Sequence, residues 1–167
     1  MPRHGYTLLE LLITLLIGTV LLTLGTPAFT GVLLDSRRTA DVNAFVTAVQ
    51  MARSESAKRA IAVRVCSTED GASCAGLGTQ FDSGWLVVAA DAEDSPLASY
   101  RPAIRGAIRS NRSAFVFRPG FRRGTNGTVV FCDQRGSEHA RAVIISYTGR
   151  PRVSDTRAGG AALDCPA

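Results

Sequence analysis

Residues 1–34 read MPRHGYTLLELLITLLIGTVLLTLGTPAFTGVLL, and this stretch decides the fold. A short basic leader ends at Gly5, and a long apolar run follows it. From Leu11 to Leu34 no side chain carries a formal charge. A helix of that length would measure about 36 Å, against about 30 Å for the hydrocarbon core of a bilayer. The sequence therefore predicts a hydrophobic transmembrane helix over residues 6–35, with one acid, Glu10, near its start.

The order of these features differs from that of a secretory signal peptide, in which an apolar region of about 7–15 residues precedes the cleavage site. Here the apolar run is longer, and the small residue suited to cleavage, Gly5, comes before it. The segment resembles the class III leader of type IV pilins and type II secretion pseudopilins. The matching features are an aromatic first mature residue (Tyr6, where the family more often has Phe), Glu10 at mature position five, and Pro27. The resemblance implies that a prepilin peptidase cuts after Gly5 and methylates the new amine.

Glu10 has a physical interpretation that agrees with this resemblance. An ionised carboxylate inside lipid costs on the order of a few kcal/mol or more and is normally paired. Cleavage would place a cationic amine on Tyr6, four residues away, and in pilin-like filaments such a carboxylate is neutralised by the N-terminus of a neighbouring subunit. The alternative is a single-pass anchor in which Glu10 lies at the membrane interface without a role.

The helix is expected to continue beyond the membrane segment. Val42, Phe45 and Val49 recur at three- and four-residue steps, which predicts one apolar face of an amphipathic helix. The opposite face is expected to carry Asp41, Asn43, Gln50, Arg53 and Glu55. We expect residues 36–60 to form the second half of the helix and to pack on a globular domain over residues 61–167. Within the first half, a proline should kink or locally melt the helix, because it removes a hydrogen bond.

After residue 60 the apolar period changes to two, which predicts β-strands. The expected strands cover residues 61–66, 85–90, 104–109, 114–121, 128–133 and 141–147. Residues 91–102 are interpreted as a loop, and residues 124–127 (GTNG) as a turn. These patterns predict an α+β, pilin-like fold, in which a long N-terminal helix packs on an antiparallel β-sandwich-like domain.

Charge is distributed unevenly along the chain, whose net charge is +5. Residues 36–100 carry six basic and eight acidic side chains, whereas residues 101–157 carry twelve arginines against three acids, a net charge of +9. Such asymmetry favours a polyanionic partner, such as nucleic acid or an anionic surface. The alternative is an arginine-rich proteome, which would spread arginine evenly along the chain.

The chain contains four cysteines, Cys66, Cys74, Cys132 and Cys165. The predicted membrane topology places them outside the cytoplasm, where an even number of cysteines indicates two disulfides. Three pairings are possible. We favour Cys66–Cys74, which closes a small loop, and Cys132–Cys165, which ties down the C-terminal tail. A zinc site is disfavoured, because no C-x-x-C pair is present and neither histidine has a metal-ligand spacing to the cysteines, so we expect no metal.

The order of strands and cysteines, including FVFRPGFRRGTNGTVVFCDQRG at residues 115–136, is similar to that of the GspH/FimT group of minor pilins and pseudopilins. Within that group, Gly149-Arg150-Pro151-Arg152 resembles the GRxR motif of FimT-type minor pilins, which bind DNA during natural transformation. Gly149 permits a sharp turn. In an extended chain, Arg150 and Arg152 would point the same way about 6.6 Å apart. Guanidinium groups so spaced can hold neighbouring phosphates of one strand.

Further arginines could extend this basic patch: Arg157 in the same tail, and Arg118, Arg122 and Arg123 around a Pro-Gly turn. The alternative for each is a solvated charge, and for the GRxR motif a solvated turn. Five aromatic residues are interpreted as core residues rather than as platforms for base stacking: Trp85, Phe115, Phe117, Phe121 and Phe131. No nucleophile motif accompanies His139, and no glycine-rich phosphate loop is present, so we expect no catalytic residue, no enzyme activity and no cofactor.

The sequence thus predicts a minor type IV pilin that binds extracellular DNA non-specifically, through its phosphate backbone, for uptake in natural transformation. Its other expected partners are pilin subunits, contacted through the N-terminal helix, the prepilin peptidase, and the inner membrane before assembly. The globular domain would be periplasmic before assembly and extracellular in the pilus. The alternative is a structural minor pilin or pseudopilin that primes or caps a type IV pilus or a type II secretion pseudopilus without binding DNA.

Overall fold

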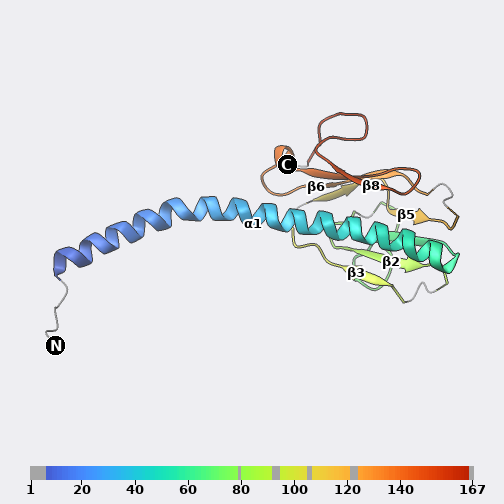
Figure 1. The fold of residues 1–167 in the computed structure, drawn as a ribbon, viewed down its shortest axis with the longest axis horizontal. Helices are drawn as coiled ribbons and strands as arrows, with labels where there is room; N and C mark the ends of the chain where they lie inside the picture. The colour runs from blue at the N-terminus through green and yellow to red at the C-terminus, as the bar shows by residue number, and fades with distance from the viewer. Residues whose placement is uncertain (1–6, 79, 92–94, 105–106, 121–123, 166–167) are drawn as a thin grey trace. The chain divides into compact units, whose positions relative to one another are not determined.

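The chain forms one long helix and two antiparallel sheets (Figure 1). This computed structural model describes residues 7–78, 80–91, 95–104, 107–120 and 124–165, and only the backbone of residues 24–28. The chain divides into two compact units, the N-terminal unit (residues 1–36) and the globular unit (residues 37–167). Helix α1, Leu8–Arg59, contributes to both units.

The start of α1 is capped by the residue that precedes it. The side-chain Oγ1 of Thr7 accepts a hydrogen bond of 3.2 Å from the backbone N–H of Glu10. This is the N-cap arrangement, and threonine followed three residues later by glutamate is the capping-box sequence. Glu10 therefore fits a local role at the helix start as well as the role predicted for a filament.

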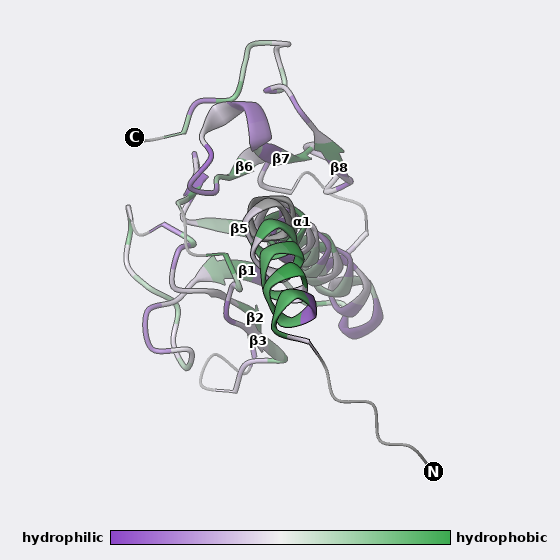
Figure 2. Cartoon of the chain, turned by 90° about the vertical axis from the view of Figure 1, so that its left-hand side faces the viewer, coloured by the Kyte–Doolittle hydropathy of each residue, from purple (hydrophilic) through white to green (hydrophobic). Residues whose placement is uncertain are grey.

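The N-terminal unit exposes its apolar side chains, from Leu8 to Leu22 and again at Phe29 and Val32; Figure 2 shows the first turns of α1 as hydrophobic. The helix continues unbroken through Pro27, so the predicted local melting does not occur. Among the described residues, no helix combines the length and the hydropathy of a membrane span. The transmembrane role of residues 6–35 stays a prediction.

In the globular unit, the second part of α1 lies between two four-stranded sheets (Figures 1 and 2). The first sheet has the strand order β3-β2-β1-β5, with β1 at Val63–Ser67, β2 at Trp85–Ala89, β3 at Ala98–Tyr100 and β5 at Ala114–Phe117. The second has the order β4-β6-β7-β8, with β4 at Ile108–Ser110, β6 at Gly127–Phe131, β7 at Arg141–Ile145 and β8 at Pro151–Ser154. A short 3-10 helix, Ser137–His139, lies between β6 and β7.

Phe45 of α1 lies at the centre of the core. Its ring centroid is between 5.3 and 6.1 Å from four other rings, all in edge-on contact: Phe81, Trp85, Phe115 and Phe131. Trp85 and Phe115 come from the first sheet, Phe131 from the second and Phe81 from the segment before β2, so one helix face joins the two sheets in a single core. The predicted α+β pilin-like fold is confirmed, as is the interpretation of Trp85, Phe115, Phe117 and Phe131 as core residues. Phe121 lies outside the described residues.

Asp41 is buried, and its predicted place on the polar face of α1 is wrong. Its Oδ1 accepts hydrogen bonds from the hydroxyl of Tyr100 and the N–H of Ala103, both at 2.9 Å, and its Oδ2 accepts one from the N–H of Ile104 at 2.8 Å. The carboxylate thus satisfies the backbone that follows β3. Burial of Tyr100, together with its hydrogen bond to Asp41, raises the pKa of Tyr100 to about 12.

The predicted strands need four corrections. Strand β3 lies inside the predicted loop at residues 91–102, and β4 covers only the end of the strand predicted at residues 104–109. Strand β8 lies in the segment that we expected to be a C-terminal tail. The strand predicted at residues 114–121 ends at Phe117 in the structure.

Candidate nucleic-acid interface

The turn between β7 and β8, residues 146–150, positions the start of the GRxR motif. The N–H of Gly149 donates to the carbonyl oxygen of Ser146 at 2.8 Å, and the N–H of Ser146 donates to the carbonyl oxygen of Arg150 at 3.1 Å. Gly149 has a φ of 75°, the left-handed conformation that glycine adopts at no steric cost. This arrangement is a three-residue hairpin loop with glycine at the bulge, and it reverses the chain immediately before Arg150.

Arg150 and Arg152 lie on one face of the second sheet. In the ladder between β7 and β8, Arg152 is opposite Ile144 and Pro151 is opposite Ile145. Ile145 faces the main core, so Arg152, and Arg150 two residues before it, lie on the other face. Both arginines are exposed. Within the described part of the chain, no acid or hydrogen-bond acceptor pairs with either guanidinium group.

The strand that carries Arg152 is at the edge of its sheet. An edge strand is one of the few places in a sheet where proline is tolerated, because its missing N–H need not belong to the ladder. Pro151 is therefore compatible with β8. The motif is held in register with β7 and is not a free tail.

Arg118 lies next to this turn. A cavity of about 310 Å³ is lined by Arg118 and Gly120 after β5, by Thr148 and Gly149 of the turn, and by Arg53 of α1. The structure thus places Arg118 near Gly149 of the motif and adds an arginine of α1 that the sequence pattern did not single out. Arg53 was expected on the polar face of α1, and its position in the helix did not indicate that it approaches the turn.

The other predicted arginines are not shown at this cavity. Arg157 follows β8, whereas Arg150 precedes it, so the whole strand lies between them. The N–H of Arg157 donates to the carbonyl oxygen of Ala161 at 2.8 Å, within a turn of the C-terminal segment. Arg122 and Arg123 lie outside the described residues, as do Gly5 and Tyr6 of the predicted cleavage site.

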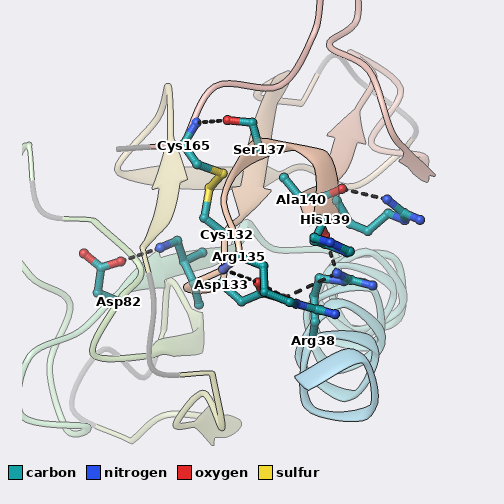
Figure 3. Close-up of a disulfide and its surroundings, with 11 residues drawn as sticks. Arg38, Asp82, Cys132, Asp133, Arg135, Ser137, His139, Ala140 and Cys165 are labelled. Carbon is teal, nitrogen blue, oxygen red and sulfur yellow. Dashed lines mark hydrogen bonds and ion pairs between the residues drawn. A yellow bond between two sulfur atoms is a disulfide. The ribbon is translucent and has the colours of Figure 1, made fainter. Parts of the chain in front are cut away.

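The C-terminal segment is tied to the outer face of the second sheet, as Figure 3 shows. Cys132 and Cys165 form a disulfide, and the N–H of Cys165 donates to the Oγ of Ser137 at 3.1 Å. Leu163 packs in a second apolar cluster on the same face, with Val130, Ala142 and Ile144. The other disulfide joins Cys66 to Cys74. The bonds present are the pairing that we favoured.

Two other arginines of the globular unit are engaged inside the protein (Figure 3). Asp133 accepts a bond of 2.7 Å from Arg135 and pairs with Arg38 at 3.4 Å, and Arg38 also donates to the carbonyl oxygen of His139. Burial acts to raise the pKa of Asp133, but the hydrogen bonds from Arg135 and the charges of both arginines hold it below its usual value. These two arginines are therefore part of the scaffold.

The fold and the N-terminal motif define a pilin-like subunit. The family model of type II transport protein GspH matches residues 41–149, and the prokaryotic N-terminal methylation motif matches residues 1–26. Because the GspH match covers more than half of the chain, the protein belongs to the GspH family. The methylation motif implies processing by a prepilin peptidase, anchoring in a membrane and assembly with other pilins.

Two solved structures are similar to this chain, both crystal structures of the type IV minor pilin FimU from Pseudomonas aeruginosa (strain PAO1). One has a TM-score of 0.53 at 19% identity and covers 72% of this chain and 92% of the FimU chain. The other has a TM-score of 0.52 at 20% identity and covers 72% and 87%. At these identities the likeness establishes the fold alone. No curated protein gives a significant match.

Proposed function

We propose that this GspH-family protein is a minor type IV pilin that binds extracellular DNA through the β7–β8 turn, for DNA uptake in natural transformation. The observation that supports this most directly is the position of Arg150 and Arg152. Arg152 lies on the edge strand β8 and Arg150 immediately precedes that strand; both are exposed, and neither pairs with an acid in the described part of the chain. Their guanidinium groups are therefore available to an external anion.

The chemistry of such a site suits a phosphate backbone. Guanidinium groups form paired hydrogen bonds with phosphate, and contacts to the backbone carry no sequence information. Arg118 and Arg53 line the cavity beside Gly149 and add positive charge near the turn. Binding would thus be mostly electrostatic, indifferent to sequence and sensitive to salt.

The N-terminal unit suits the membrane anchoring and filament assembly of a pilin. After cleavage at Gly5 and methylation of Tyr6, the exposed apolar side chains of α1 would lie in the inner membrane and later against other pilin subunits. The globular unit would be periplasmic before assembly and extracellular in the pilus. Two disulfides suit those oxidising compartments. The proposal requires no catalytic residue and no cofactor.

A second candidate is a structural subunit that primes or caps a pilus or a type II secretion pseudopilus without binding DNA. The family match favours it, because the matched model is described as a type II transport protein. The match also ends at Gly149, so Arg150 and Arg152 lie beyond the part of the chain that it covers. In this role the arginines would meet acidic faces of partner subunits.

A DNA-binding titration separates the two candidates. The full chain in a non-ionic detergent is titrated into a labelled duplex of arbitrary sequence, and fluorescence anisotropy is recorded. The double variant Arg150→Gln with Arg152→Gln is expected to bind at least about tenfold more weakly. Arg37→Gln with Arg101→Gln removes two exposed charges elsewhere and should bind nearly as the wild type does. Equal affinities of the wild type and the Arg150/Arg152 variant would favour the structural candidate.

A further inference from the structure

Among the described residues of the globular unit, one aromatic side chain lies largely in the solvent, at the turn that carries the motif. Tyr147 is 62% exposed. The other aromatic side chains described in this unit are buried or half-buried: Phe45, Phe81, Trp85, Tyr100, Phe115, Phe117 and Phe131. Tyr147 was expected at the end of a strand, but β7 stops at Ile145 and the tyrosine is in the turn itself. The core therefore gives no reason for an aromatic residue here.

The backbone around Tyr147 is held in place while its ring stays exposed. Its carbonyl oxygen accepts a hydrogen bond of 2.9 Å from the N–H of Gly124. The hydroxyls on either side of it, of Ser146 and Thr148, are 2.8 Å apart and bonded to each other. The turn therefore presents the ring at a fixed point of the backbone, three residues before Arg150.

An exposed aromatic ring in a turn that leads directly into exposed arginines is a combination that proteins use for single-stranded nucleic acid. The arginines follow the backbone phosphates, and a base stacks on the aromatic face without regard to its identity. A duplex keeps its bases stacked on one another, so it can offer the ring no free base face. The cavity beside the turn is lined by Phe117, Thr148 and Arg53 among others, so it offers an adjacent nucleotide apolar surface next to an arginine.

We propose that the β7–β8 turn binds single-stranded DNA in preference to duplex DNA, with Tyr147 stacking on a base while Arg150 and Arg152 hold the adjoining phosphates. This inference rests on the proposed function, since it assigns a strand preference to the same site. Tyr147 is then the residue that determines strand preference, and the arginines determine affinity for any DNA.

Three ligands of equal length test it with the full chain in a non-ionic detergent: a single strand, the matching duplex, and an abasic single strand that keeps the phosphates but lacks the bases. Affinities are compared for the wild type, Tyr147→Ala and Tyr147→Trp. The wild type should bind the base-bearing strand at least about fivefold more tightly than the abasic strand. Tyr147→Ala should abolish that difference and leave the abasic and duplex affinities unchanged, whereas Tyr147→Trp should preserve it.

The inference is overturned if the wild type binds the abasic and base-bearing strands equally. It is also overturned if Tyr147→Ala lowers the affinities for the base-bearing and abasic strands by the same factor, or changes neither affinity. The Arg150→Gln, Arg152→Gln variant distinguishes this failure from failure of the proposed function. If that variant loses affinity for all three ligands while Tyr147→Ala changes none, only the strand preference is wrong. If the arginine variant binds all three as the wild type does, the DNA-binding function is wrong as well.

Discussion

Arg38 of α1 and Asp133 after β6, which are 95 residues apart in the sequence, form an ion pair inside the globular unit. Their nearest charged atoms are 3.4 Å apart, and their side chains are only 8% and 1% exposed. Arg135 binds the same carboxylate at 2.7 Å. These three residues join α1 to the connection that leads into β7. The turn with the arginine motif follows directly after β7.

Asp133→Asn should destabilise the protein by about 3–5 kcal/mol at pH 7, because it leaves the buried charge of Arg38 without its counter-ion. Thermal unfolding of the full chain, followed by circular dichroism in a non-ionic detergent, measures the change. Glu55→Gln is the matched control: it removes an acid that pairs with Arg59 and Lys58 near the surface, and it should leave the unfolding temperature nearly unchanged.

The difference in stability between the wild type and Asp133→Asn should depend on pH in a predictable way. The pKa of Asp133 is lowered in the folded protein, so the unfolded chain takes up the proton first as the pH falls. The stabilisation that ionised Asp133 provides is present above the pKa of about 3.9 that an aspartate has in the unfolded chain. It is lost as the pH falls through the pKa of Asp133 in the folded protein. The difference between wild type and Asp133→Asn should thus be constant above about pH 6 and shrink below about pH 4. A difference that grew towards low pH would contradict this assignment.

Gly149→Ala should disturb both the fold and the interface. A Cβ at this position would lie 2.9 Å from Cδ1 of Phe117 and 3.3 Å from Cδ of Arg53, and the backbone has a φ of 75°. Gly160→Ala shares the positive φ, 82°, but its Cβ would meet nothing within 4 Å. Gly160→Ala is therefore the control, and its free energy of unfolding should fall by about 1 kcal/mol from backbone strain alone.

Gly149→Ala should lose at least about 1–3 kcal/mol more than that control, because the added methyl group also overpacks the ring of Phe117. Since the turn fixes Arg150, affinity for DNA should fall too. Urea unfolding and a DNA titration on the two variants provide the comparison. Equal stability losses at positions 149 and 160 would show that the contact with Phe117 is not tight.

The two disulfides should contribute unequally to stability. Cys132 and Cys165 are 33 residues apart in the sequence, whereas Cys66 and Cys74 are 8 apart. Loop-closure entropy predicts about 3.7 kcal/mol for the first bond and about 2.5 kcal/mol for the second. Replacing each pair by serine and comparing the unfolding free energies tests the order. A larger loss for the Cys66–Cys74 pair would show that native-state contacts, rather than loop length, decide the contribution.

The helix and the core were largely predictable, because their signals are local and periodic. The spacing of Val42, Phe45 and Val49 indicated the buried face of α1, and each of them is in the core. Asp41 was predicted on the polar face of this helix, but it is buried. It lies one residue before Val42 and accepts three hydrogen bonds from residues 100–104, a long-range contact that no helical period can reveal.

The strands were predictable where five residues alternate or form an apolar run, as at β1, β2, β6 and β7. Strands β3 and β4 have only three residues each, too few to establish a period. Strand β8 begins with Pro151 and carries a charge, features that indicate a loop unless the strand is known to be an edge.

The candidate site was predictable at the level of the motif and not at the level of its surroundings. Gly149 and the two arginines follow from four consecutive residues. The exposure of Tyr147 depends on where β7 ends, and the approach of Arg53 depends on how α1 packs on β5 and the turn. The engagement of Arg135 by Asp133 likewise required the folded structure.

The salt dependence of DNA binding shows whether Arg150 and Arg152 hold phosphates. If about four arginines contact phosphates, the logarithm of the affinity for duplex DNA should fall with the logarithm of salt concentration at a slope near −3.6. Removing the guanidinium groups of Arg150 and Arg152 should reduce the slope to about −1.8, because each lost phosphate contact accounts for about 0.9. Equal slopes for the wild type and the Arg150→Gln, Arg152→Gln variant would contradict the account, since these two arginines would then hold no phosphate.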